Sequence, residues 1–570
     1  MCDITSIGSL SRALLCVLVI SVLSPAAAGI HKGSPASCGD HACDHGDGET
    51  ASNRVLVPIA RLMYSAMPPG EQAKLRAAGA LGAPDDGALA SGSRPERGDA
   101  RRWLERRLDT LNDGSFTADQ RDALRSIADA VDEGRGVPMM CFAPGTDPEY
   151  ASMMNALLYA PNPIAFQQAD RWGRTALSGP GLQQGDPTTI TYSFVPDGTV
   201  IPSEFTGFPD GNSILFIWLN SIYDSPSNWQ PLFDQVFDRW SELIGTDYVH
   251  EPNDDGLALA PSNLGIQGVR GDVRIAAFPV DGNSGILAFN FFPQFGGDMV
   301  FDAFDSFYDE TSNNSLRFRN VAAHEHGHGL GMFHVCPVSQ TILMEPFATT
   351  AFDGPQLDDT LNGQRHYGDP LEPNDGASDA TDLGALGVDD TISAEAVSVD
   401  DALDDEDWFS FELTEPARII FETMPDAAAY TQGPQTEQCD TGAFTDYNAV
   451  MDFRITIYAA SDPSSALAQV DEVTSPPFDP SETLEFVADA AGEYLVQVEG
   501  VSSDFNFDTN MTDIQKYKAD LTISEPPFLG PTLAVDALDT TPPASFSSVS
   551  ATVDPRQDTL AGAPVLFSRT

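Results

Sequence analysis

The sequence predicts an α+β protein of several domains: a helical region, then a domain with a mixed sheet, then a β-sandwich. The chain has 570 residues, for which about two to four domains are expected. Apolar residues recur at helical spacing before residue 165, in helical and strand patterns from 165 to 369, and in short alternating runs from 370 to 525. With 42% hydrophobic residues, the chain can bury a core in each part.

Acidic residues dominate the charge, with 85 Asp and Glu against 29 Lys and Arg and a net charge of −56. This excess excludes nucleic-acid binding through a basic face, and anionic membranes should repel the chain. The acidic residues are spread along the sequence, which indicates a strongly solvated surface, suited to a salty medium, unless local motifs bind calcium.

Residues 1–28 have the pattern of a secretory signal peptide that is cleaved after Ala28. Arg12 precedes the apolar run Ala13–Leu23, and small residues lie at the cleavage site. A membrane anchor would need ~20 apolar residues, whereas this run has 11 and then meets Pro25. We therefore expect a secreted, extracellular protein without membrane insertion.

Residues 29–164 are predicted to form a leader and a helical, propeptide-like region. The leader is rich in Gly, Asp and His, and its stretch Cys38–His45 is either a flexible loop or a metal-binding segment. Apolar residues recur at helical spacing in Trp103–Leu111, and Thr117 with Gln120 fits a capping box at a helix start.

Residues 165–369 are predicted to hold helices and a mixed sheet. A helix with an apolar, core-facing stripe is expected from Ser227 to Gly245. Strands are expected at Thr189–Val195, Val273–Phe278 and Ile286–Phe292. Strands that alternate with helices favour an α/β layer.

Residues 370–525 have the short alternating strands and frequent turn residues of a β-sandwich. Residues 369–407 are acidic and predicted to be mostly loop, and residues 526–570 are predicted to form a disordered tail. The expected strands are Trp408–Leu413, Ile419–Thr423, Phe453–Tyr458, Leu484–Ala488 and Tyr494–Val498.

The motif that carries chemistry lies between residues 324 and 334, where four of the nine histidines of the chain are found. His324 and His328 are four residues apart, so a helix places both imidazoles on one face, where they can share a metal ion. Gly331 allows a sharp turn that returns His334 as a third ligand.

Three neutral imidazoles and one water form an open tetrahedral site, the arrangement of catalytic zinc. Glu325, next to the first ligand, can reach the zinc-bound water, take its proton and pass it to the leaving amine. His326 lies off the ligand face and is assigned no role. The alternative for the whole segment is a solvated, histidine-rich helix end.

The pattern H-E-x-x-H-x-x-G-x-x-H resembles the zinc signature of the metzincin metallopeptidases. Met344, ten residues after His334, fits the methionine turn that this clan places below the zinc. The stretch Leu357–Gly368 resembles the final helix of the matrixin branch. The resemblance covers residues 165–369 and implies a metzincin-type catalytic domain that uses Zn2+ to hydrolyse proteins or peptides.

A neighbouring stretch resembles the part of matrixins that binds a second, structural zinc and calcium. Phe289 and Val300 stand where its zinc-binding histidines would be, so a structural zinc is not expected. Asp298 and Asp302 remain as oxygen ligands and either bind Ca2+ or belong to an acidic turn. The resemblance also implies that the strand Gly285–Asn290 pairs with an extended substrate, and that the segment after the methionine turn lines the pocket beyond the scissile bond.

The cysteines do not decide how the predicted propeptide would keep the peptidase inactive. Five remain after removal of the signal peptide, so at least one has no partner within the chain. Matrixin propeptides can place a thiolate on the zinc, and Cys38 and Cys141 are the candidates here. A disulfide between Cys141 and Cys336 is the alternative.

The C-terminal region resembles the bacterial pre-peptidase C-terminal domain, a β-sandwich appended to secreted peptidases. The resemblance implies an accessory role in secretion, folding or surface binding. Asp404, Asp405 and Asp407 either bind calcium or form a solvated acidic turn. The resemblance covers residues 370–525 and is carried by Leu371–Asp375, Asp404–Phe411 and Ala491–Val498.

The sequence supports a secreted zinc-dependent endopeptidase, because all three ligands and Glu325 are present. The alternative is a secreted binding or adhesion protein with a catalytically inactive metzincin-like domain. A zinc hydrolase for another class of substrate is a third interpretation, and the matrixin-like context around Met344 and Tyr367 argues against it. Nothing in the sequence indicates an oligomeric state.

Overall fold

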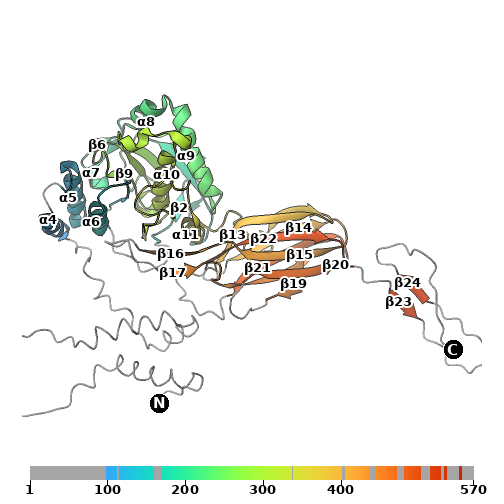
Figure 1. Ribbon diagram of the computed structural model, residues 1–570. Coiled ribbons are helices and arrows are strands. Elements are labelled where there is room, and N and C mark those ends of the chain that lie inside the picture. Colours follow the sequence, from blue (N-terminus) through green and yellow to red (C-terminus); the bar gives the residue numbers. More distant parts are fainter. Residues whose placement is uncertain are drawn as a thin grey trace, which may run out of the picture.

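The structure is a computed structural model that describes residues 98–111, 115–135, 137–158, 168–336, 338–400, 403, 405–434, 443–471, 480–501, 514–527, 532–535 and 551–554. The predicted signal peptide, the leader with Cys38, and Asp404 lie outside the described residues. Within them, no helix has the length and apolar character needed to span a bilayer. Figure 1 shows a domain of helices and sheet next to an elongated set of strands.

Three helices and one strand come before the other strands of the main sheet in the chain, and the three helices lie in the region predicted to be helical. They are α4 (Ala100–Thr110), α5 (Ala118–Glu133), β1 (Met139–Phe142) and α6 (Pro148–Leu158). The predicted capping box is present, because Thr117 and Gln120 exchange side-chain-to-backbone hydrogen bonds at the start of α5. The helix ends at Gly134, whose φ of 73° is left-handed.

A six-stranded sheet forms the centre of this domain, in the order β1-β9-β10-β8-β4-β7. Strands β4, β7, β8 and β10 are parallel, whereas β9 is antiparallel to both β10 and β1. The predicted mixed sheet is therefore observed. Its strands after β1 are β4 (Thr188–Phe194), β7 (Thr246–His250), β8 (Val273–Phe278), β9 (Ile286–Asn290) and β10 (Met299–Asp302).

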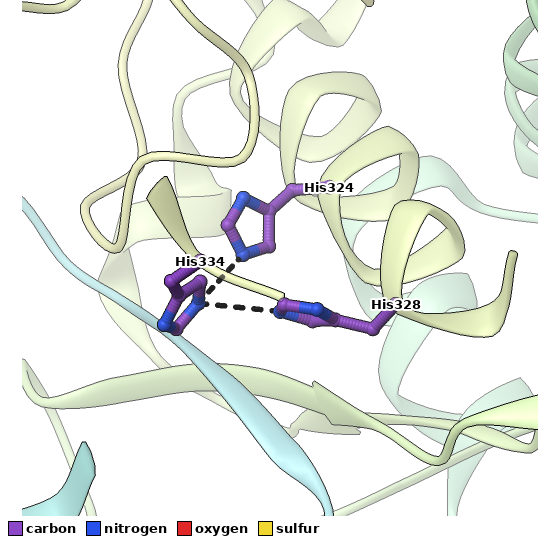
Figure 2. A group of neighbouring side chains, drawn as sticks. All are labelled: His324, His328 and His334. Carbon is purple, nitrogen blue, oxygen red and sulfur yellow. Dashed lines mark hydrogen bonds between the residues drawn. The ribbon is translucent and has the colours of Figure 1, made fainter. Parts of the chain in front are cut away.

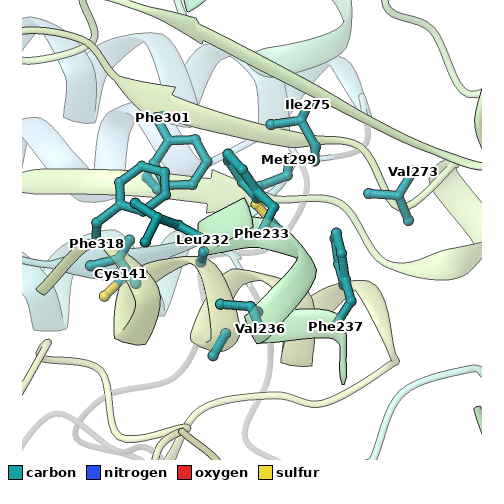
Figure 3. Packing of buried hydrophobic residues seen from close by; sticks show 14 of the residues in the cluster. Cys141, Leu232, Phe233, Val236, Phe237, Val273, Ile275, Met299, Phe301 and Phe318 are labelled. Carbon is teal, nitrogen blue, oxygen red and sulfur yellow. The ribbon is translucent and has the colours of Figure 1, made fainter. Parts of the chain in front are cut away.

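Helices α8 (Leu215–Tyr223), α9 (Pro226–Ser241) and α10 (Ser312–Gly329) pack against the sheet, and α11 (Leu357–Tyr367) follows them in the chain. The predicted apolar stripe of α9 is buried: the Phe233 ring lies 5.9 Å from that of Phe301 and 5.1 Å from that of Phe318, as Figure 3 shows. This helix begins at Pro226, before the predicted start, because proline fits the first helical position.

The short elements of the domain lie mainly in its connections. They are β2 (Arg174–Thr175), β3 (Gly179–Pro180), β5 (Val200–Ile201), α7 (Ser203–Thr206), β6 (Gly211–Asn212), η2 (Pro293–Phe295), η3 (Ser306–Asp309) and β11 (Val335–Cys336).

Two sheets of mainly antiparallel strands share one apolar cluster, which includes Phe409, Phe421 and Val496. The predicted β-sandwich is therefore present. The first sheet is β12 (Thr381–Leu386), β14 (Glu406–Leu413), β21 (Gly492–Val501), β18 (Asp452–Ala459) and β19 (Asp462–Val470). The second is β13 (Thr391–Asp400), β22 (Ile514–Ser524), β15 (Ala417–Pro425) and β20 (Glu482–Ala488).

Two stretches of the C-terminal half contain strands that were not predicted from the sequence. The stretch 369–407, expected to be mostly loop, contains β12 and β13. Strand β13 is held by its antiparallel ladder with β22 and buries Val397 and Val399. The tail, expected to lack regular structure, contains the paired strands β23 (Thr532–Val535) and β24 (Ala551–Asp554).

The sandwich contacts the mixed-sheet domain next to α11. Strand β11 pairs with β16 (Ala429–Pro434), which also pairs with β17 (Ala443–Asp446). Arg365 of α11 forms a buried ion pair with Asp400 at 3.2 Å, and the Tyr430 hydroxyl donates to Asp358 at 2.8 Å. These contacts fix α11, which also supports the loop described below.

Candidate active site

Helix α10 presents His324 and His328 one turn apart, and both rings are buried. The Nδ1 atom of His324 lies 2.7 Å from the backbone oxygen of Leu343, and Nδ1 of His328 lies 2.6 Å from that of Met332. Because a carbonyl only accepts, each Nδ1 carries the proton and each Nε2 is left as a free lone pair.

Gly331 brings the third histidine back to the helix. Its φ of +100° is left-handed, and a Cβ there would lie 2.6 Å from the backbone oxygen of Asp170, so only glycine fits without strain. The turn places Nε2 of His334 3.2 Å from Nε2 of His324 and 3.2 Å from Nε2 of His328. Figure 2 shows the three rings pointing toward one another.

The spacing of these nitrogens fits a zinc ion. Zinc–nitrogen distances of about 2.0–2.1 Å in a tetrahedral site separate two ligand nitrogens by roughly 3.3 Å, close to the 3.2 Å found here. Burial lowers the pKa of His324 to about 4 and that of His328 well below its usual value. The two rings are therefore neutral, as metal ligands must be.

The Glu325 carboxylate is buried beside this cluster. Neither of its oxygens has a hydrogen-bond partner among the described residues. Burial raises the pKa of Glu325 well above its usual value, and the nearby backbone amide of Cys141 opposes this shift without hydrogen-bond geometry. A buried carboxylate without a partner is costly, so the site favours a cation or a polar ligand at this position.

Met344, the residue predicted to form the methionine turn, packs against helix α10 at Gly327. A Cβ on Gly327 would lie 2.3 Å from the Met344 sulfur, so the sulfur packs against a helix position that has no side chain. Asp359 of α11 holds the turn, because its carboxylate accepts the backbone N–H of Leu343 at 2.8 Å and of Met344 at 3.1 Å. The Leu343 carbonyl in turn orients His324.

His326 is buried away from the three ligands. Its Nε2 lies 2.7 Å from the Tyr248 hydroxyl, and its ring packs edge-on against Phe237. The helix thus divides its histidines between a metal-facing side and a core-facing side.

Asp298 and Asp302, the residues predicted to share calcium, do not converge. The Asp298 carboxylate accepts the backbone N–H of Arg274 at 3.1 Å, whereas Asp302 accepts those of Val280 at 2.8 Å and Asp281 at 3.3 Å. Neither belongs to a group of three potential ligands in the described part of the chain. The geometry does not support one ion held by both.

Phe289 and Val300, at the positions of the absent zinc-binding histidines, are direct partners in the β9–β10 ladder. Both are buried in the apolar cluster that α4, α5 and α6 share with the sheet. Phe289 stacks at 5.3 Å on Phe208. The place where the structural zinc would bind is therefore filled by apolar side chains.

The predicted alternative of a Cys141–Cys336 disulfide is wrong. Cys141 is a free, buried thiol, and Cys336 is disulfide-bonded. The Cys141 sulfur lies within 4.8 Å of potential ligand atoms of His324 and Glu325. It does not belong to the group that the three imidazoles form. Its position is thus on the Glu325 side of the cluster. Cys38 lies outside the described residues.

A second group of potential metal ligands lies at the start of the sandwich and comprises Glu372, Asp405 and Asp407. Burial raises the pKa of Glu372 to about 7 and those of Asp405 and Asp407 well above their usual value. One oxygen of Asp405 is buried without a partner, and Asp407 accepts from the Tyr517 hydroxyl at 2.6 Å. The solvated acidic turn considered from sequence does not describe this cluster.

Two features of the site have no marker in the sequence. Asp359 falls within a stretch recognised as the final helix, but its bond to the methionine turn depends on how that helix packs. Cys141 was considered only for its thiol, whereas its backbone amide also lies beside Glu325. A pattern of residue types carries no information on either contact.

The family model described as matrixin (Peptidase_M10) matches residues 220–368. Stromelysin-3 of Mus musculus is 40% identical over 99 residues, covering 16% of this chain and 19% of that protein. Interstitial collagenase of Equus caballus is 38% identical over 149 residues, covering 25% and 29%. The chain therefore spans less than a third of the length of these relatives.

A comparison of structures matches the pre-peptidase C-terminal domain of a collagenase from Bacillus anthracis. The match has a TM-score of 0.15 and 12% identity, and it covers 25% of this chain and 96% of that chain.

Proposed function

Residues 220–368 form a matrixin domain, and from this premise we propose that the chain is a secreted zinc-dependent endopeptidase. The observation that carries the proposal is the convergence of three buried imidazoles beside a buried carboxylate without a partner. His324, His328 and His334 would hold the zinc, and Glu325 would act as the base. Secretion rests on the signal-like pattern of residues 1–28.

Bound zinc supplies a Lewis acid that polarises the scissile carbonyl and makes water more acidic. Glu325 takes a proton from the attacking water and gives it to the nitrogen of the leaving amine. The carbonyls of Leu343 and Met332 keep the ligand rings oriented. The buried surroundings of Glu325 exclude bulk water, which strengthens each of these electrostatic interactions.

Calcium belongs to the proposal as a stabilising ion. Glu372, Asp405 and Asp407 support it better than Asp298 and Asp302, because their oxygens lie within 4.8 Å of one another and one Asp405 oxygen lacks a partner. Hard oxygen ligands in such a cluster suit Ca2+. The alternative of an inactive adhesion protein has no comparable support, since no ligand and no base is missing from the site.

The proposal is tested by comparing wild type with Glu325→Gln in a zinc-dependent digest of a fluorogenic peptide. The variant should lose at least ~10²-fold in kcat/KM, because the base is gone, while zinc content measured by atomic emission stays near one ion per chain. Glu415→Gln, an exposed glutamate on the sandwich, is the matched control and should retain full activity. Unchanged activity in Glu325→Gln would refute the assigned base.

A further inference from the structure

The third candidate ligand is followed directly by a strand that pairs with the C-terminal half of the chain. Strand β11 begins at the residue after His334 and has only two residues. On one side, the Val335 N–H donates to the Met344 oxygen of the matrixin domain at 3.0 Å. On the other side, both residues of β11 pair with β16. Because a strand this short is held by its neighbours, the chain after His334 depends on β16 for one of its two supports.

The position of His334 is set differently from the positions of the other two ligands. His324 and His328 lie on α10, and a backbone oxygen of the matrixin domain orients each of their rings. His334 lies beyond the end of that helix, after the turn at Gly331. Since glycine allows many backbone conformations, contacts on both sides of the turn must fix its path. The contacts that follow the turn are those of β11.

Tyr430 of β16 joins the two domains. Its ring packs against the apolar cluster around α9 and α10 and also against the apolar cluster of the sandwich. Its hydroxyl donates to the Asp358 carboxylate of α11 at 2.8 Å, and its ring stacks on that of Tyr447 at 4.8 Å. The Tyr447 oxygen accepts from the Gln515 side chain of β22 at 2.9 Å. These contacts lead from the sandwich to the strand that supports β11, at the junction of the domains in Figure 1.

Helix α11 is shared between the two domains in the same way. Leu361 is buried in the apolar cluster of the sandwich, and Leu357 packs against that cluster. The Gln364 side chain donates to the Ala396 oxygen of β13 at 2.6 Å. The same helix carries Asp359, which holds the methionine turn. The C-terminal region therefore contacts two supports of the candidate zinc site, β11 and α11.

We propose that β16 is a positioning element of the zinc site and that Tyr430 is the positioning residue that fixes it. The proposal rests on the proposed function and extends it, because a strand from outside the matrixin domain would place the third ligand. Tyr430 acts through β11 and α11 and touches no reacting atom. The C-terminal region is then part of the catalytic unit, beyond the accessory roles that the sequence resemblance implies.

The experiment compares zinc affinity in full-length variants by competition with a fluorescent chelator. Tyr430→Ala removes the ring that contacts both apolar clusters. We expect zinc binding to weaken about tenfold, the lower end of the range for groups that orient a metal ligand. Phe444→Ala is the matched control, because Phe444 is an aromatic residue of the neighbouring strand β17 and is 72% exposed. Equal zinc affinity in these two variants would overturn the proposal.

Two further readouts separate positioning from a general loss of stability. Excess zinc should restore the kcat of Tyr430→Ala toward that of wild type, because the weakened step is metal binding. A merely structural role would lower the melting temperature of the zinc-free chain and leave the zinc affinity of the folded chain unchanged. A raised KM with unchanged zinc affinity would assign β16 to substrate binding instead. Either result would contradict the proposal.

A conservative variant keeps the test decisive if Tyr430→Ala does not fold. Tyr430→Phe keeps the ring and loses only the bond to Asp358, so zinc binding should weaken about threefold, the effect of one hydrogen bond. Asp358→Asn keeps an acceptor for the hydroxyl and should not share this loss. Zinc affinity in Tyr430→Phe equal to that of wild type would then overturn the proposal.

The same measurements distinguish failure of this proposal from failure of the proposed function. If wild type binds zinc and digests the fluorogenic peptide, and the Tyr430 variants bind zinc equally well, the positioning role is wrong and the peptidase stands. If wild type neither binds zinc nor digests the peptide, the proposed function fails.

Discussion

Met344 can reach the ligand helix because residue 327 is glycine: a Cβ there would lie 2.3 Å from the methionine sulfur. Gly327 stands between two of the predicted ligands, His324 and His328, at a position where the zinc pattern accepts any residue. The pattern therefore identifies the ligands without showing why they are held so closely. At the residue scale, the packing under the metal site depends on side chains outside the motif.

Asp359 is the residue that we expect to matter most outside the motif. Asp359→Asn leaves a buried amide facing the N–H groups of Leu343 and Met344, so the methionine turn and His324 should lose their fixed position. We expect zinc affinity to fall about 10–100-fold, the usual cost of losing a residue that orients a ligand. Competition with a fluorescent chelator measures this affinity.

Asp358→Asn provides the matched control. The Asp358 carboxylate is next to Asp359 in the chain, but it accepts a hydrogen bond from Tyr430 and makes none to the methionine turn. Zinc affinity should remain close to that of wild type. An Asp359→Asn protein that binds zinc as tightly as Asp358→Asn would contradict the role assigned to Asp359.

Much of this site could be predicted at the residue scale, because the helical spacing of His324, Glu325 and His328 is local. The return of His334 followed from the conformational freedom of Gly331, which the structure bears out with a positive φ. The link between Asp359 and Met344 could not be predicted, since it joins residues that only tertiary packing brings together. The same holds for Cys141 and Glu325, which lie close together in the fold but far apart in the sequence.

At the scale of elements, strands with large alternating apolar residues were predicted well. Predicted β8 has the observed bounds, and the cores of β14, β15 and β18 were located correctly. Strand β19 was missed because almost all of its side chains are exposed, so no apolar alternation marks it. Edge strands of this kind are specified by backbone pairing with a neighbour.

The acidic cluster at the start of β14 predicts a response to calcium. Because Glu372, Asp405 and Asp407 lie close together and are costly to ionise without a cation, Ca2+ should raise the melting temperature of the chain above its value in chelator. Asp405→Asn should reduce that rise, whereas Asp489→Asn, at an exposed position of the sandwich, should not. Differential scanning fluorimetry over a calcium titration measures the shift. Equal melting curves with and without Ca2+ would remove the ion from the account.

At the scale of the whole molecule, a net charge of −56 coexists with carboxyl groups that are buried. Burial raises the pKa of Asp298 and of Asp302 to about 8. Both groups hold a proton in the folded chain at neutral pH, whereas they are ionised in the unfolded chain. The sandwich adds Asp369, whose pKa burial raises to about 7. Composition alone could not show this division between solvated and buried acids.

Stability should therefore decrease as the pH rises from about 6.5 to 8. A folded-state pKa above the unfolded value of about 3.9 means that the folded chain binds more protons, so the free energy of unfolding falls with pH until those groups have ionised. Buried histidines with lowered pKa values change the free energy of unfolding only below about pH 6.5, which lies below this window. Urea denaturation at several pH values measures the slope, and Asp298→Asn should flatten it relative to Asp489→Asn. Stability that increases with pH across this window would contradict the account.

The central claim is a zinc ion held by His324, His328 and His334 and by no thiol, and X-ray absorption at the zinc edge tests it most directly. For the purified chain with one equivalent of zinc, we expect three imidazole nitrogens at about 2.0–2.1 Å and one further oxygen or nitrogen. A sulfur neighbour at about 2.3 Å, or a first shell made mainly of carboxylate and water oxygens, would contradict it.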